Sequence, residues 1–212
     1  MAPSSHLEQQ QLAERVRVAA HLTDPRIVQA FAAVPRHEFL YDEQRAIAYE
    51  DRALSLSEGQ TVSQPSMIAL MLAALDCKAS DRALEVGAGS GYAAALLGQL
   101  VREVYAIELR PALAELARKN LKRAGTTNVE VVLGDGAEGL VRHAPYDRIL
   151  VSAAPQQVPA ALIEQLAVTG KLAIPVGDNR SQSLLVGEKA ETEQMHWQRS
   201  VSCSFVPLVV GG

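Results

Sequence analysis

A short glycine-rich loop is the first feature of the sequence that could do chemistry. Gly87, Gly89 and Gly91 follow an apolar run at residues 83–86 and precede an apolar stretch at residues 92–101. This order predicts a buried strand, a tight loop and a helix, a unit that brings backbone N–H groups and a helix N-terminus towards a polar ligand. We expect a nucleotide-like ligand, although a glycine turn that binds nothing fits the same pattern.

The spacing of the glycines separates two kinds of nucleotide site. The dinucleotide fingerprint is G-x-G-x-x-G/A, whereas here the third glycine comes one residue earlier and Tyr92 stands where the last Gly or Ala should be. Gly-x-Gly-x-Gly after Leu-Glu-Val resembles motif I of S-adenosylmethionine (AdoMet) methyltransferases. AdoMet has no pyrophosphate, so it does not need the dinucleotide spacing. The loop therefore favours AdoMet.

Two carboxylates follow the next two predicted strands. Glu108 ends an apolar run at 104–108, and Gly134-Asp135-Gly136 follows a run at 129–133. Ligands of doubly wound sheets sit beyond the carboxyl ends of the strands, where Glu108 could accept from ribose hydroxyls and Asp135 from an exocyclic amine. Taken singly, Glu108 could be a solvated charge and Asp135 a turn former. Their order at successive strand ends favours one binding site.

A second reactive segment lies outside the alternating strands and helices. Residues 61–65 read Thr-Val-Ser-Gln-Pro and run into an apolar stretch at 67–75. A Ser close before a Pro is a common start of a helix, so on the residues alone capping is the simpler interpretation of Ser63. The alternative is that this segment holds the molecule on which the enzyme acts.

The remaining pattern predicts the elements that position these residues. Strands alternate with helices, which indicates a Rossmann-like, doubly wound α/β fold with a mostly parallel sheet, an antiparallel end strand and preceding N-terminal helices. We expect residues 1–10 to be frayed, 36–53 to be irregular with room for a short helix, and 59–66 to be a loop. The predicted strands are 83–86, 104–108, 129–133, 146–152, 172–176, 184–188 and 197–206, and the predicted helices 11–21, 25–34, 67–75, 92–101, 111–125 and 159–166.

The last predicted strand alternates apolar and polar residues. Trp197, Val201, Cys203 and Phe205 fall on one side of it, which predicts that this side is buried. Cys203 is therefore expected to be a core residue rather than a reactive thiol.

Composition bounds the class of protein. The 212 residues are 48% apolar and 21% charged, with a net charge of −4, which suits one globular domain and argues against nucleic-acid binding. Two distant cysteines form no metal-ligand spacing, and neither a signal peptide nor a membrane span is predicted. We expect a single cytoplasmic domain over 1–212, built from an N-terminal extension (1–80) and a Rossmann-like core (81–212), with no metal. The sequence is silent on oligomeric state, and a monomer is favoured.

Four segments together resemble the motifs of protein-L-isoaspartate O-methyltransferases. They are Val34-Pro-Arg-His-Glu-Phe39, Thr61-Val-Ser-Gln-Pro65, Leu84-Glu-Val-Gly-Ala-Gly-Ser-Gly-Tyr92 and Val206-Pro-Leu208. The resemblance implies a seven-stranded sheet, AdoMet as cofactor, and methylation of the free carboxylate of L-isoaspartyl residues in damaged proteins and peptides.

The resemblance also implies roles for individual residues. The active-site serine of the family falls on Ser63, and Thr61 and Val62 join it in substrate binding. The ribose-binding acid falls on Glu108, and the adenine-side Asp-Gly on 135–136. The residues expected to bind AdoMet are Glu85, Gly87, Ala88, Gly89, Ser90, Gly91, Glu108, Leu109, Asp135 and Gly136.

The implied chemistry agrees with what the sequence offers. A carboxylate acceptor is already ionised at neutral pH and needs no general base, so methyl transfer depends mostly on positioning. Ser63 is then expected to orient the acceptor as a hydrogen-bond donor. It is not expected to be a nucleophile, because no motif pairs it with a base.

Two departures from the family pattern bear on the acceptor. Val209-Val210 follows Val-Pro-Leu where the family usually has a polar residue, and Glu58 stands where many bacterial members have His. These leave two alternatives open: an AdoMet methyltransferase that acts on another small-molecule or peptide carboxylate, and a protein that binds AdoMet without turnover.

Overall fold

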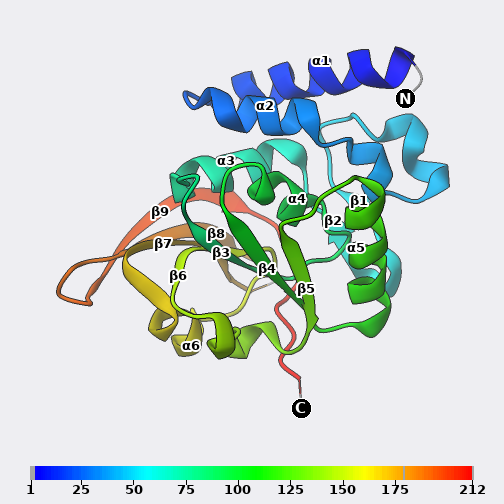
Figure 1. Ribbon diagram of the computed structural model, residues 1–212. Helices are drawn as coiled ribbons and strands as arrows, with labels where there is room; N and C mark the ends of the chain where they lie inside the picture. The colour runs from blue at the N-terminus through cyan, green and yellow to red at the C-terminus, as the bar shows by residue number, and fades with distance from the viewer. Residues whose placement is uncertain (1–2, 179, 212) are drawn as a thin grey trace.

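A seven-stranded sheet forms the centre of the computed structural model, which describes residues 3–178 and 180–211 (Figure 1). Its strands are β3 (Arg82–Val86), β4 (Glu103–Glu108), β5 (Val129–Leu133), β6 (Tyr146–Val151), β7 (Leu166–Gly177), β8 (Gln182–Lys189) and β9 (Met195–Cys203). Their order is β5-β4-β3-β6-β7-β8-β9. The first five are parallel, and β8 is antiparallel to both β7 and β9. The predicted fold class is confirmed.

Helices cover both faces of the sheet. They are α1 (Pro3–Ala19), α2 (Pro25–Ala33), α3 (Pro65–Leu75), α4 (Tyr92–Gly98), α5 (Pro111–Arg123) and α6 (Ala160–Glu164). Figure 1 shows α1 and α2 stacked above α3, with α6 on the opposite side of the sheet. Proline opens α2, α3 and α5, where its fixed φ suits the first turn and its missing N–H costs nothing. None of the helices within the described residues is long and apolar enough to span a bilayer.

Two hydrophobic clusters sandwich the sheet. The larger joins the N-terminal helices to α4 and α5, and the smaller lies under α6. Along β3, Ala83 belongs to the larger cluster whereas Leu84 and Val86 belong to the smaller one. Because side chains alternate along a strand, Glu85 faces the larger cluster, and Glu108 of β4 does the same two residues after Ala106. Both carboxylates thus reach the same side of the sheet.

Several N-terminal expectations were wrong. Residues 3–10, which we expected to be frayed, belong to α1, whose Gln9 amide donates to the Ala32 carbonyl over 2.8 Å and ties the helix to α2. The expectation for 36–53 holds in contrast, because this irregular region contains short 3-10 helices, η1 (Arg36–Phe39) and η2 (Asp42–Ile47). The expected loop at 59–66 contains β2 (Thr61–Val62), which pairs with β1 (Leu54–Ser55).

The C-terminal strands also differ from expectation. Helix α6 ends at Glu164 and β7 already begins at Leu166, because the apolar run at 159–166 is shared between the two elements. Trp197 and Val201, which we expected to be buried, are 38% and 39% exposed. Strand β9 is at the edge of the sheet, and alternation alone does not determine which side is covered. Cys203 does pack against the larger cluster, although it is only partly buried.

Candidate functional site

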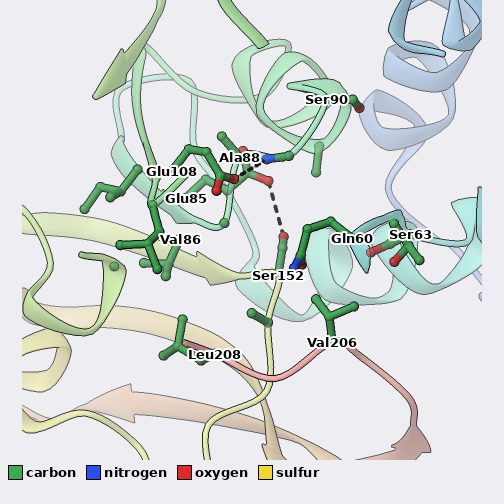
Figure 2. A pocket seen from close by; sticks show the side chains of 18 of the residues that line it. Gln60, Ser63, Glu85, Val86, Ala88, Ser90, Glu108, Ser152, Val206 and Leu208 are labelled. Carbon is green, nitrogen blue, oxygen red and sulfur yellow. Dashed lines mark hydrogen bonds between the residues drawn. The ribbon is translucent and has the colours of Figure 1, made fainter. Parts of the chain in front are cut away.

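A cleft of about 760 Å³ opens beyond the carboxyl ends of β3, β4 and β6. Residues 85–91 and 107–110, which we call the glycine corner, form one wall. Residues 54–65, which we call the acceptor segment, contribute the opposite wall through Gln60, Thr61, Val62 and Ser63. The C-terminal segment 206–209 closes a third side. Figure 2 shows Glu85 and Glu108 facing the cleft from one side, with Gln60 and Ser63 across from them and Val206 and Leu208 below.

The cleft gathers most of the residues that the sequence singled out. Eleven of the thirteen predicted site residues line it, namely Thr61, Val62, Ser63, Glu85, Gly87, Ala88, Gly89, Ser90, Glu108, Leu109 and Gly136. Gly91 and Asp135 are not in the lining.

The N–H groups of the glycine loop are used within the protein. Gly87 and Ala88 donate from their backbone nitrogens to the Ile107 carbonyl over 2.9 and 3.0 Å, and Gly89 donates to Glu108 Oε2 over 2.9 Å. The expectation that the loop brings its backbone N–H groups towards a ligand was therefore wrong for Gly87, Ala88 and Gly89. A phosphate cradle needs free N–H groups, so this loop is unlike a pyrophosphate site.

Gly91 has a packing role. Its φ is 86°, and a Cβ at this position would lie 3.1 Å from Leu121 Cγ of α5 and 3.3 Å from the Ala117 carbonyl oxygen. The next residue, Tyr92, is buried, and its ring lies 5.4 Å from that of Phe39 between centroids. Small size at Gly91 thus lets α4 start close to α5, while the first residues of α4, Tyr92 and Ala93, line the cleft.

Glu85 is the most unusual acid in the lining. Its side chain is 1% exposed, Oε1 accepts a hydrogen bond from Ser152 Oγ over 3.2 Å, and Oε2 has no hydrogen-bond partner among the described residues. Burial raises the pKa of Glu85 to about 8, the charge of Glu108 adds to the rise, and the Ser152 hydrogen bond opposes it. A buried carboxyl in the cleft lining, with one oxygen that has no hydrogen-bond partner among the described residues, is suited to a cationic ligand group.

Glu108 is held by backbone donors. Oε2 accepts from the Gly89 nitrogen, and Oε1 accepts from the Arg110 nitrogen over 3.0 Å at the start of α5. The side chain is 6% exposed and lines the cleft. Each carboxylate oxygen can accept more than one hydrogen bond, so Glu108 keeps capacity for ligand hydroxyls.

Asp135 and Gly136 do not act alike. Asp135 Oδ1 accepts from the Ala137 nitrogen over 2.8 Å and caps the 3-10 helix η4 (Gly136–Glu138), and Oδ2 accepts from the Gly211 nitrogen over 2.7 Å. Gly136 lines the cleft, and a Cβ there would lie 2.4 Å from Val86 Cγ1. The cleft therefore needs a glycine at 136, whereas the Asp135 carboxylate is occupied by the chain.

The helix-capping interpretation of Ser63 was wrong. Helix α3 begins at Pro65, and the N-cap residue Gln64 makes no side-chain capping bond. The cap comes from Asp51, whose Oδ1 accepts from the Ser66 nitrogen over 2.8 Å. Ser63 is half-buried and lines the cleft. Its side chain is thus available to a ligand.

A buried arginine fixes the backbone around Ser63. Arg36 is fully buried, and its guanidinium donates to the carbonyls of Ala48, Glu50 and Arg52 over 3.0, 2.8 and 2.8 Å, and to that of Ser63 over 3.3 Å. Burial lowers the pKa of Arg36. One side chain therefore joins η2 and the segment after it to the acceptor segment.

Sequence reasoning missed three parts of this site. Ser152 follows β6, which neighbours β3, so its place at a strand end was a usable signal. Arg36 lies inside a motif that the sequence analysis quoted, but nothing in its neighbours indicates that it is buried. Arg110 reaches the acceptor segment through a contact between residues 52 positions apart. No group of three metal-ligating side chains occurs within the described residues.

Comparisons with known proteins agree with this geometry. The sequence profile of the family Protein-L-isoaspartate(D-aspartate) O-methyltransferase (PCMT) matches residues 7–211. The chain is similar to the protein-L-isoaspartate O-methyltransferase of Roseiflexus sp. (strain RS-1), with 49% identity over 90% of this chain and 87% of the relative. It is also similar to that of Aeropyrum pernix, with 45% identity over 93% of this chain and 78% of the relative.

Solved structures show the same fold. One, a protein-L-isoaspartate O-methyltransferase, has a TM-score of 0.85 and 28% identity, and the match covers 96% of this chain and 66% of that one. A second, a beta-aspartate methyltransferase from Plasmodium falciparum in complex with S-adenosyl-L-homocysteine, has a TM-score of 0.82 and 23% identity over 95% of this chain. Profile, relatives and fold thus agree over nearly the whole chain, which belongs to the protein-L-isoaspartate(D-aspartate) O-methyltransferase family.

Proposed function

We propose that this protein transfers the methyl group of AdoMet to the free carboxylate of L-isoaspartyl residues in damaged proteins and peptides. The observation that carries the proposal is the single cleft in which the glycine corner faces the acceptor segment, with Glu85 and Glu108 on one wall and Ser63 on the other. A donor and an acceptor bound on these two walls would meet inside the cleft.

The glycine corner fits AdoMet in charge and shape. AdoMet supplies a methyl group on a positively charged sulfur, and its amino-acid end carries an ammonium group. Two buried carboxylates, one with a free oxygen, suit these cations, and Glu108 also retains capacity for ribose hydroxyls. The glycine loop offers no phosphate cradle, because its N–H groups donate to β4 and to Glu108.

The acceptor segment fits a carboxylate that is already ionised. An isoaspartyl carboxylate has an ordinary pKa near 4, so the protein does not have to remove a proton from it. We assign to the Ser63 hydroxyl the task of donating a hydrogen bond to one oxygen of this carboxylate. Thr61 and Val62 are assigned to the contacts around it. Fixing the two reactants in line can supply about 7–11 kcal/mol of a reaction barrier.

Arg36, which is buried and is not in the cleft lining, supports this geometry. Its hydrogen bonds hold the Ser63 backbone without placing a charge at the reacting atoms. Asp135 keeps its role on the adenine side as a prediction; its carboxylate accepts from the Ala137 and Gly211 nitrogens, and Asp135 is not in the cleft lining. The cytoplasmic location, the monomeric state and the lack of nucleic-acid partners also stay predictions.

Labelled AdoMet and matched peptides test the proposal. Two peptides of one sequence, containing isoaspartate or aspartate at the same position, are incubated with the purified protein. We expect a base-labile methyl ester on the isoaspartyl peptide alone. Equal labelling of both peptides, or labelling of neither while AdoMet binds, would contradict the proposed acceptor.

A second acceptor is favoured by one observation. Val209 lines the cleft and is 47% exposed, so an apolar side chain stands in this part of the lining. An AdoMet O-methyltransferase with another small-molecule or peptide carboxylate as acceptor would use the same walls. Failure of the isoaspartyl peptide together with labelling of such a carboxylate would identify this function, and binding without any labelling would identify a protein that binds AdoMet without turnover.

A further inference from the structure

Arg110 connects the two walls of the cleft. On the side of the glycine corner, its backbone nitrogen donates to Glu108 Oε1 over 3.0 Å, and Glu108 in turn accepts from the Gly89 nitrogen. Its backbone is therefore fixed to the part of the cleft that we assign to AdoMet.

The guanidinium of Arg110 reaches the acceptor segment. Nη1 donates to Glu58 Oε2 over 2.7 Å. With the Gln60 amide turned so that its oxygen faces Arg110, this oxygen accepts from Nε over 3.2 Å and from Nη2 over 3.1 Å. Gln60 directly precedes Thr61, and both Gln60 and Arg110 line the cleft. We call Glu58, Gln60 and Arg110 the clasp.

The backbone of Glu58 gives a second, independent sign of constraint. Its φ of 56° and ψ of 30° are in the left-handed region, and Gly59 follows with a φ of 70°. A residue with a Cβ is uncommon there and persists where its surroundings hold it. A glycine would relieve the backbone but could not supply the carboxylate that Arg110 contacts. The side chain at 58 therefore has a task that the turn alone does not explain.

We propose that Arg110 is a positioning residue that holds the acceptor segment at a fixed distance from the glycine corner. The inference rests on the proposed function. Among the described residues that line the cleft, Arg110 alone carries a positive charge. Its pairing with Glu58 keeps this charge from capturing the acceptor carboxylate in an unproductive place. The clasp aligns the acceptor and does not take part in the chemical step.

The size of the effect follows from exposure. The side chains of Arg110 and Glu58 are 28% and 39% exposed, so the pair is screened by water and salt. We expect its loss to raise the KM for an isoaspartyl peptide about two- to fivefold, with little change in kcat. The affinity for S-adenosylhomocysteine, measured by calorimetry, should stay within about twofold of the wild-type value.

Two variants test the clasp: Glu58→Gly, and the double variant Glu58→Arg with Arg110→Glu, which exchanges the two charges. Glu58→Gly accepts the left-handed backbone and removes the side chain together with its carboxylate, so it should raise KM and speed amide hydrogen exchange in residues 54–64. Exchange in 81–91 should not change. The double variant Glu58→Arg with Arg110→Glu restores the pair with its charges exchanged, and we expect it to recover at least half of the loss that either single variant shows.

The outcomes separate this inference from the proposed function. A Glu58→Gly protein with wild-type KM and wild-type exchange would overturn the clasp, because the turn conformation alone would then suffice. Single variants whose defects simply add in the double variant would also overturn it. If the wild-type protein labels no isoaspartyl peptide, the proposed function fails, and hydrogen exchange alone then decides for or against the clasp.

Discussion

The two walls of the cleft are built in different ways. The glycine corner is fixed by backbone hydrogen bonds of parallel strands, such as those from Gly87 and Ala88 to Ile107. The acceptor segment has only two paired residues on each side, Leu54–Ser55 and Thr61–Val62, and its position is set by side chains from distant parts of the chain. Arg36 and Arg110 provide these contacts, and the nearby Asp51 accepts from the Gln64 side chain and from the Ser66 nitrogen at the end of the segment.

This difference implies that the two walls can be damaged separately. Regular strand pairing makes the glycine corner insensitive to single side chains outside it. The acceptor segment, in contrast, should lose its geometry when one distant side chain is removed. Variants of the acceptor segment should therefore impair methyl transfer with little effect on cofactor affinity. Variants of the glycine corner should mainly weaken cofactor affinity.

Removal of Arg36 should have the largest effect. Arg36→Met keeps much of the volume but leaves four carbonyl groups without their donor, and we expect it to lower the free energy of unfolding by about 3–5 kcal/mol. Urea unfolding measures this change. The folded fraction should bind S-adenosylhomocysteine within about threefold of wild type and methylate poorly.

Arg52→Met is the matched control for Arg36. The Arg52 side chain is 61% exposed, so its replacement should change the free energy of unfolding by less than about 0.5 kcal/mol. If Arg36→Met were as stable as this control, Arg36 would not hold the acceptor segment as described.

Ser63→Ala should affect catalysis without affecting the cofactor. The lost hydrogen bond to a charged acceptor oxygen corresponds to about 10- to 100-fold in kcat/KM. S-adenosylhomocysteine affinity, by calorimetry, should be unchanged. Ser66→Ala, on α3 and outside the cleft lining, is the control and should retain wild-type turnover. A large loss of cofactor affinity in Ser63→Ala would show that this serine belongs to the cofactor wall.

Glu85→Gln should change the glycine corner alone, and its effect on the free energy of unfolding should depend on pH. The folded protein retains a proton on Glu85 up to about pH 8, whereas the unfolded chain loses it near the ordinary value of 4.5. Stability from this group is therefore present below pH 4.5, falls as pH rises to about 8 and is constant above. At pH 8 we expect Glu85→Gln to be more stable than wild type by about 1–2 kcal/mol, as urea unfolding would show.

The same proton should couple to cofactor binding. A cationic ligand group favours the ionised form of Glu85, so the affinity for S-adenosylhomocysteine should rise between pH 6 and pH 8, with release of a proton. The other charged side chains among the described residues of the cleft lining are Glu108, which raises the pKa of Glu85, and Arg110. Calorimetry in buffers of different ionisation enthalpy measures the number of protons released when S-adenosylhomocysteine binds. A pH-independent affinity in wild type, matching that of Glu85→Gln, would contradict this role of Glu85.

The sequence predicted the residues of the glycine corner better than the contacts that hold the acceptor segment. Glycine spacing and strand ends are local signals, so Glu85, Glu108 and Gly136 were expected where the structure has them. The positions of Arg36, Asp51 and Arg110 depend on contacts across 15 or more residues, for which no local pattern exists. Asp135 is the exception among the strand ends, because its carboxylate caps η4 and accepts from Gly211, and the residue is not in the cleft lining.

Errors outside the site have the same origin. Residues 3–10 have little apolar periodicity, and the contact of Gln9 with α2 supports a helix that the sequence alone does not indicate. In β9 the alternation of Trp197 and Val201 correctly predicts a strand, but tertiary contacts decide which side is covered.

A crystal structure of the protein with S-adenosylhomocysteine tests the central claim most directly. We predict the ligand in the cleft, its ammonium group at Glu85, its ribose at Glu108, and its sulfur directed across the cleft towards Ser63. A ligand bound elsewhere, or a cleft filled by residues 206–209 while Ser63 turns away from the sulfur, would contradict the claim that the two walls bring donor and acceptor together.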